Sequence, residues 1–343
     1  MKSKAVLLPL FLCSILACTR QVAQPQIGFS LFSDEIKSGI NRVEKSIVGV
    51  NTDIVYEVQT FNYVTRNGEW VPQPNSRRKY KLASGDAGIT YKTDKKTLVG
   101  GGLLLDVDRL NSNYTILTSS HLVSPEDTVN VFYMDEDGAK TDVLFARYVL
   151  KSLRITVRDG NVVSPEAELI ANSYANDLAI IKVEAKERLG REFRNQIGYD
   201  LDLDWGDWVF LFGYPKGIKQ MSGGWVSKSP YPRTIAIDAV VRFGYSGGPV
   251  FTFSEDKTEL AFVGVIKNVP RTNLDYIAPD QTLPVGSALG SQDLPKLSVK
   301  RAILVTYGTA YFVDNKSIKS FLNSARNTMN DFGISLARKF YGN

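Results

Sequence analysis

The only histidine in the chain is His121, so any imidazole chemistry takes place there. It follows the apolar run 114–118 and a pair of serines. At the end of such a strand an imidazole can face a cleft and act as a general base near neutral pH. One histidine also excludes sites that need several imidazoles, including most catalytic zinc sites. We therefore expect no metal ion and no cofactor.

A serine flanked by glycines is the candidate nucleophile. Residues 244–249 read GYSGGP, with Ser246 at the centre and apolar runs on both sides. Glycines allow a sharp turn that presents amide N–H groups inward. A serine hydroxyl also needs a nearby base and donors for the developing oxyanion. We expect the amides of Gly244 and Ser246 to supply that oxyanion hole, although such a motif also makes ordinary flexible turns.

Asp177 is the third candidate, at the start of the apolar run 178–183. By itself, an aspartate at this position is typical of a turn or a cap. Beside His121 it would fix the tautomer of the imidazole and stabilise the imidazolium. The three residues together predict a triad in which Ser246 is the nucleophile, His121 the general base and Asp177 the group that orients it.

The order His, Asp, Ser resembles that of trypsin-like serine peptidases and differs from that of subtilisins and α/β-hydrolases. The resemblance is greatest to the bacterial HtrA/Deg type and covers residues 45–325, apart from two insertions. Its motifs are GGG at 100–102, LTSSH at 117–121, DLAIIKV at 177–183 and FGYPKG at 212–217. It implies a serine endopeptidase that acts on protein or peptide substrates through an acyl-enzyme on Ser246.

The chain also departs from this family. Tyr245 stands where the family usually has Asn, and fewer than 20 residues follow position 325, so we expect no PDZ domain. The resemblance implies substrate-binding residues before the nucleophile and on a later strand. Apolar residues there favour a small aliphatic side chain before the scissile bond, rather than Lys or Arg. These residues are Val240, Val241, Val263, Gly264 and Val265.

Short apolar runs rich in β-branched residues predict an all-β protein. We expect two six-stranded antiparallel β-barrels, a short N-terminal helix after Ser33, and a C-terminal helix with apolar residues at helical spacing from Ile318 to Phe340. The N-terminal lobe, residues 31–195, would carry His121 and Asp177. The C-terminal lobe, 196–343, would carry Ser246. Two insertions, 65–96 and 268–300, read as long loops of the kind that are functional or disordered, and whether they gate the cleft stays open.

The first residues predict export. Lys2 and Lys4 precede an apolar stretch that ends at Ala17, so residues 1–17 read as a signal peptide. Cys18 resembles the lipidated cysteine of bacterial lipoproteins, which makes 18–30 a lipid-anchored tether; an ordinary signal peptide is the alternative. Thr19 does not resemble the inner-membrane retention signal, which favours the outer membrane, facing the periplasm or the cell surface.

The charge balance argues against nucleic acid as a partner. The 343 residues contain 41 Lys and Arg and 36 Asp and Glu, a net charge of +5 without a long basic run. The oligomeric state stays open. So do two alternatives to peptidase activity: a catalytically inactive, protease-like binding or chaperone lipoprotein, and an esterase that uses the same site.

Overall fold

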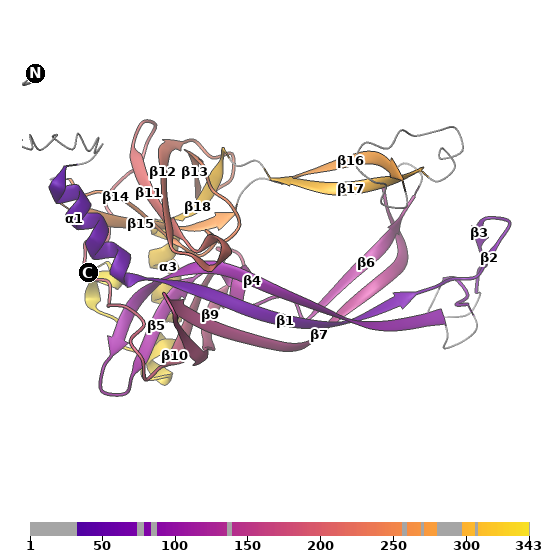
Figure 1. Cartoon of the computed structure of the whole chain (residues 1–343), viewed down its shortest axis with the longest axis horizontal. Coiled ribbons are helices and arrows are strands. Elements are labelled where there is room, and N and C mark those ends of the chain that lie inside the picture. The colour runs from indigo at the N-terminus through magenta and orange to yellow at the C-terminus, as the bar shows by residue number, and fades with distance from the viewer. Residues whose placement is uncertain are drawn as a thin grey trace, which may run out of the picture. The chain divides into compact units, whose positions relative to one another are not determined.

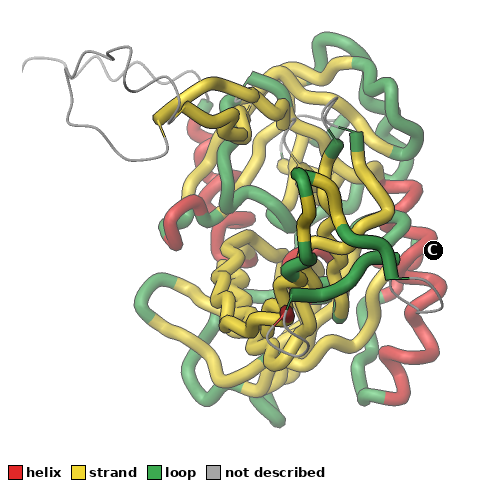
Figure 2. The backbone as a smooth tube through the Cα atoms, turned by 90° about the vertical axis from the view of Figure 1, so that its right-hand side faces the viewer, coloured by secondary structure: helices red, strands yellow, loops and turns green. Residues whose placement is uncertain are grey.

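The computed structural model describes residues 33–342 except 74–78, 84–87, 136–138, 256–258, 269–270, 280–296 and 306–307. Residues 34–343 group as one compact unit. Strands make up most of the described backbone, and helices are few (Figure 2). No described helix is both long enough and apolar enough to cross a bilayer. The predicted signal peptide, the tether and Cys18 lie outside the described residues.

The first lobe is a curled antiparallel sheet of eight strands, in the order β6-β7-β1-β4-β5-β10-β9, with β8 paired to β7. Its core gathers apolar side chains such as Val50, Ile116 and Ile181. The strands are β1 (Ile47–Phe61), β4 (Ile89–Asp108), β5 (Asn113–Thr118), β6 (Thr128–Met134), β7 (Lys140–Asp159), β8 (Val162–Glu166), β9 (Glu168–Ser173) and β10 (Leu178–Glu184).

Three of these strands are 15 to 20 residues long. β1, β4 and β7 run beyond the lobe as a twisted arm, on the right of Figure 1. Part of the predicted loop 65–96 is therefore strand, since β4 pairs with β1 from Leu103↔Ile47 to Ile89↔Phe61. The outer half of β4 is polar and mostly exposed, so it lacks the buried alternate face that identifies a strand in sequence. The small strands β2 (Thr65–Arg66) and β3 (Glu69–Trp70) pair beyond it.

The second lobe is a closed six-stranded barrel, in the order β11-β12-β13-β18-β15-β14. Phe312, Val250 and Ile237 are among the residues that fill it. The all-β, trypsin-like fold is thus confirmed, with one closed barrel and one curled sheet rather than two closed six-stranded barrels. The barrel strands are β11 (Trp208–Gly213), β12 (Gln220–Ser227), β13 (Thr234–Ala239), β14 (Pro249–Phe253), β15 (Leu260–Asn268) and β18 (Ala310–Asp314).

The second insertion is also partly folded. β16 (Arg271–Pro279) pairs with β17 (Leu297–Val305) as a separate two-stranded sheet. The apolar end of β17, residues 302–305, therefore does not enter the barrel, because β18 occupies the place between β13 and β15. A short apolar run does not by itself say which strand it will pair with.

The predicted helices are present. α1 (Asp34–Val43) buries Ile36, Gly39 and Val43, and the helix lies against β15. α3 (Asn315–Asp331) begins where Asp314 accepts a hydrogen bond from the Ser317 amide at 2.7 Å. It ends earlier than predicted and contacts both lobes, through β9 and β18. The remaining short helices are α2 (Ser120–Val123), η1 (Glu44–Ser46), η3 (Pro215–Gly217) and η5 (Arg338–Tyr341).

Candidate active site

His121 stands just beyond strand β5, on the single turn α2. Its side chain is 43% exposed, which leaves the ring open to a cavity of about 890 Å³. Two residues that precede the turn hold it in place through side-chain hydrogen bonds. Thr118 Oγ1 donates to the carbonyl of Gly101 at 2.8 Å, and Ser119 Oγ donates to the carbonyl of Ile266 at 3.1 Å. The imidazole is therefore mounted on a segment tied to both lobes.

Asp177 is buried beside His121 and contacts it twice. One carboxylate oxygen accepts the His121 backbone N–H at 2.9 Å, and the other lies 2.8 Å from His121 Nδ1. Asp177 adopts a left-handed conformation, with φ of 54°, at the end of a turn closed by its own amide on Tyr174. Asp is among the few residues that accept this conformation readily. Since Nδ1 faces a carboxylate, it carries the proton, and Nε2 presents a lone pair.

The Ser246 loop is shaped by Gly244, which has φ of 105°. A side chain at this position would collide with the backbone of Pro215. The Gly244 carbonyl accepts a hydrogen bond from the Tyr214 amide at 2.7 Å, and the Tyr245 amide closes a turn on Arg242. Across the part of the chain that the structure describes, no hydrogen bond uses the amide N–H of Gly244 or of Ser246. Both predicted oxyanion-hole donors are thus unoccupied.

Backbone hydrogen bonds hold the serine loop against the first lobe. The Gly101 amide donates to the Ser246 carbonyl at 2.8 Å, and the Gly247 amide donates to the Ile266 carbonyl, also at 2.8 Å. Ile266 is thus an acceptor for both the His121 turn and the Ser246 loop. A side chain at Gly100 would meet the Ser246 carbonyl oxygen at 2.5 Å. The glycines at 100–102 therefore allow the backbone of β4 to lie close to the backbone of the Ser246 loop.

The structure brings His121, Asp177 and Ser246 to the wall of one cavity. The Ser246 hydroxyl donates to the Lys267 carbonyl at 3.5 Å, a long hydrogen bond. Transfer of its proton to His121 Nε2 therefore requires the hydroxyl to turn toward the imidazole. Contacts of this kind commonly tighten only when substrate is bound.

Only one of the five predicted substrate-binding residues lines the cavity. Val241 lines the cavity, whereas Val240 is 63% exposed and is absent from its wall. Val263 and Val265 are buried in the barrel, and Gly264 packs against Phe312. The later strand reaches the cavity one residue further on, through Ile266 and Lys267. Sequence reasoning missed this pair, because strand register decides which residues face the cleft.

Tyr245, the departure from the family pattern, is accommodated by a neighbouring glycine. Its ring packs where a side chain on Gly213 would otherwise lie. The residue is 3% exposed, and burial raises the pKa of its hydroxyl. Tyr245 is thus a core residue of the barrel, and its size does not displace Ser246 from the cavity.

Lys219 joins the two lobes away from the cavity. Its ammonium lies 2.7 Å from Glu44 Oε1 and 3.1 Å from Asp159 Oδ1, both on the first lobe. Burial opposes this charge, but the hydrogen bond to Glu44 and the neighbouring negative charges outweigh it and raise the pKa of Lys219. The contact fixes the loop after β11, which also carries the Tyr214 amide that holds Gly244.

A closed barrel beside a curled antiparallel sheet, with the His–Asp pair on one and the serine loop on the other, defines the chymotrypsin-like class of folds. Residues 100–265 match the profile of the trypsin-like peptidase domain. The predicted resemblance to the HtrA/Deg type is confirmed by relatives that carry the DegP name.

Two relatives are each named "Probable periplasmic serine endoprotease DegP-like". The protein from Bartonella henselae is 30% identical over 146 residues, which are 39% of this chain and 27% of the relative. The one from Brucella suis is 29% identical over 147 residues, 40% of this chain and 23% of the relative. The matched region is thus about a quarter of each relative's length.

The solved structures that the chain matches include the HtrA-type protease AlgW with a decapeptide. It has a TM-score of 0.43 at 14% identity, over 86% of this chain and 67% of that one. The serine endoprotease from Yersinia pestis has a TM-score of 0.44 at 13% identity, over 87% and 68%.

Proposed function

We propose that this chain is a serine endopeptidase that cleaves proteins through an acyl-enzyme on Ser246. The observation that carries the proposal is the two-point contact of Asp177 with His121 in the cavity that Ser246 also lines. The amides of Gly244 and Ser246, which have no partner among the described residues, complete the set of groups that acyl transfer requires.

In the first half-reaction, Ser246 Oγ attacks the carbonyl carbon of the scissile bond while His121 Nε2 takes the hydroxyl proton. The amides of Gly244 and Ser246 hold the oxyanion, and Asp177 stabilises the imidazolium. When the C–N bond breaks, His121 returns the proton to the leaving amine. In the second half-reaction, His121 takes a proton from water, the resulting hydroxide attacks the ester, and Ser246 recovers its hydroxyl.

The specificity proposal rests on the cavity wall near Val241. An apolar residue there favours a small aliphatic side chain before the scissile bond. Profiling with a peptide library tests this: enrichment of Ala, Val or similar residues at that position supports it. Enrichment of Lys or Arg contradicts it.

The test of the activity is hydrolysis of a fluorescent denatured protein by the purified chain and by Ser246→Ala and His121→Ala. Each variant should lose about 10⁴-fold or more in rate, because the members of a triad act as a unit. An intact rate in both would refute the mechanism. Hydrolysis of small esters without hydrolysis of the protein would indicate an esterase, and a folded chain inert on both would indicate a binding or chaperone protein.

We also propose that the chain is exported and anchored by a lipid on Cys18, on the outer membrane facing the periplasm or the cell surface. Support comes from the residue pattern before Cys18 and from relatives named as periplasmic. Metabolic labelling with a fatty-acid analogue tests the anchor. Label that disappears in Cys18→Ala supports it, whereas secretion of an unlabelled chain cut near Ala17 supports an ordinary signal peptide.

We propose further that each lobe supplies part of the triad. The N-terminal lobe, residues 31–195, carries His121 and Asp177, and the C-terminal lobe, 196–343, carries Ser246. The two sheets support this division, since β5 and β10 flank the His–Asp pair and β14 follows the serine. The triad is therefore complete only when the two sheets are held together.

A further inference from the structure

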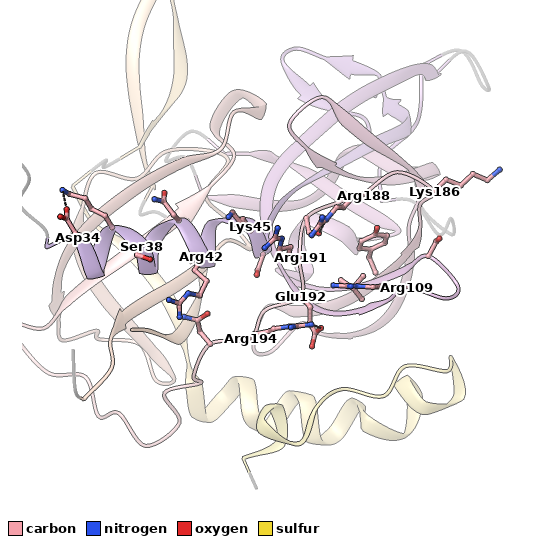
Figure 3. Close-up of a pocket in the computed structure, with 18 residues that line it drawn as sticks. Asp34, Ser38, Arg42, Lys45, Arg109, Lys186, Arg188, Arg191, Glu192 and Arg194 are labelled. Carbon is pink, nitrogen blue, oxygen red and sulfur yellow. Dashed lines mark hydrogen bonds and ion pairs between the residues drawn. The ribbon is translucent and has the colours of Figure 1, made fainter. Parts of the chain in front are cut away.

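A second cavity, of about 1040 Å³, opens away from the triad and shares no lining residue with the first. It is bounded by α1, by the end of the β4–β5 hairpin and by residues 186–195, which follow β10 (Figure 3). These three segments are far apart in sequence, and the fold brings them to one place.

The wall of this cavity is strongly basic. It carries eight cationic residues but only two carboxylates, Asp34 and Glu192. Three of the cations are paired: Lys37 with Asp34, Arg42 with Glu259 and Arg194 with Glu192. Among the residues that the structure describes, the other five form no ion pair. These five are Lys45, Arg109, Lys186, Arg188 and Arg191.

The backbone holds several of these cations together. The Arg191 amide donates to the Lys45 carbonyl at 2.7 Å, and Arg188 Nε donates to the Gly190 carbonyl at 3.0 Å. A side chain at Gly190, where φ is 99°, would meet the same Lys45 carbonyl at 2.6 Å. Figure 3 shows Lys45, Arg188 and Arg191 gathered near the end of α1, whereas Lys186 extends away.

Like charges held together repel one another and destabilise the compact state. An anion in the cavity relieves that cost, and a guanidinium presents a planar set of donors that matches phosphate oxygens in pairs. Asn195 on the wall adds a buried amide nitrogen that has no acceptor within the described ranges. A concave site suits a compact anionic group better than a nucleic-acid duplex, which needs an extended basic face.

We propose that this cavity binds a compact ligand carrying two or more phosphate groups, either soluble or on a lipid headgroup. The site is separate from the peptidase centre, so the proposal does not depend on catalysis. The sequence gives no sign of this basic site, because the eight cations are divided among residues 37–45, 109 and 186–194 and form no continuous basic run.

The test compares the full chain with Arg188→Gln/Arg191→Gln and with a control, Lys92→Gln/Lys95→Gln. The control removes the same charge from exposed residues of β4 that do not line the cavity. Two probes distinguish the sources: inorganic tripolyphosphate, measured by calorimetry, and vesicles that contain cardiolipin, whose headgroup carries two phosphates, measured by flotation against phosphatidylcholine vesicles. A lipid anchor would bind both kinds of vesicle and cancels in the comparison.

For at least one probe, the cavity variant should bind about tenfold more weakly or worse than the control, because each guanidinium removed takes charge-assisted hydrogen bonds with it. Loss with tripolyphosphate points to a soluble ligand, and loss with vesicles alone points to a headgroup. Binding of neither probe by the parent chain, or equal binding by both variants, overturns the proposal. If the double variant does not fold, Arg109→Gln, on the exposed hairpin, replaces it with the same criteria.

Discussion

Asp177 holds His121 through both of its carboxylate oxygens, one on the backbone amide and one on the ring nitrogen Nδ1. The first contact positions the turn α2, and the second orients the imidazole. Because the carboxylate is buried, it is poorly screened by solvent, and its interaction with a developing imidazolium is strong. This pair therefore determines both where the imidazole lies and how its ring is oriented.

Asp177→Asn should lower kcat/KM by about 10⁴-fold, because an amide can donate to Nδ1 and thereby stabilise the wrong tautomer. Kinetics on a fluorescent peptide would measure the loss. Asp238→Asn, which changes an exposed carboxylate on β13, is the matched control and should keep full activity. Equal rates for the parent chain and Asp177→Asn would show that Asp177 has no part in catalysis.

Gly244→Ala should reduce kcat by about 10²–10³-fold, because it displaces a backbone N–H that the oxyanion hole needs. The new methyl group collides with the backbone of Pro215, and φ of 105° disfavours any side chain. Gly68→Ala has a similarly positive φ but nothing within 4 Å, so it separates backbone strain from the collision. An active Gly244→Ala enzyme would mean that this loop does not form the oxyanion hole.

Lys219→Met should destabilise the protein by about 1–3 kcal/mol, because it leaves Glu44 and Asp159 without their shared partner. Urea unfolding followed by tryptophan fluorescence would measure the change. Lys316→Met breaks a pair with Asp202 that is almost fully solvated, and it should have little effect. Similar changes in the two variants would show that the contact between the lobes contributes no special stability.

Lys339 should make stability depend on pH in the alkaline range. Burial lowers the pKa of its ammonium to about 8, from 10.5 in the unfolded chain. Between these values the unfolded chain binds more protons than the folded one, so the contribution of Lys339 to stability rises with pH. Urea midpoints from pH 7 to 10 should therefore increase in the parent chain relative to Lys339→Met. Parallel curves would contradict the lowered pKa.

The fold class was predictable, and the three candidate residues could be singled out, because short local motifs carry both. The turn before His121, the start of β10 and the glycines around Ser246 are readable as short motifs, and their order narrows the fold. The long arm was not predictable, because the outer half of β4 has no buried face and resembles a polar loop. Pairing with β1, which is distant in sequence, is what makes it a strand.

Sequence also could not identify which residues of β15 line the cavity that contains Ser246. Val263 and Val265 belong to the strand that sequence identified, yet Ile266 and Lys267 reach the cleft. Register against neighbouring strands decides this, and a shift of one residue reverses the faces. The basic cavity depends on three segments meeting in space, which no single stretch of sequence records.

The most direct test of the central claim is labelling with a fluorescent fluorophosphonate, followed by mass mapping of the modified peptide. This reagent reacts with a serine only where a base and an oxyanion hole are assembled around it. The account predicts one label at Ser246, absent from Ser246→Ala and strongly reduced in His121→Ala. A folded chain that takes no label, or takes it at another serine, would contradict it.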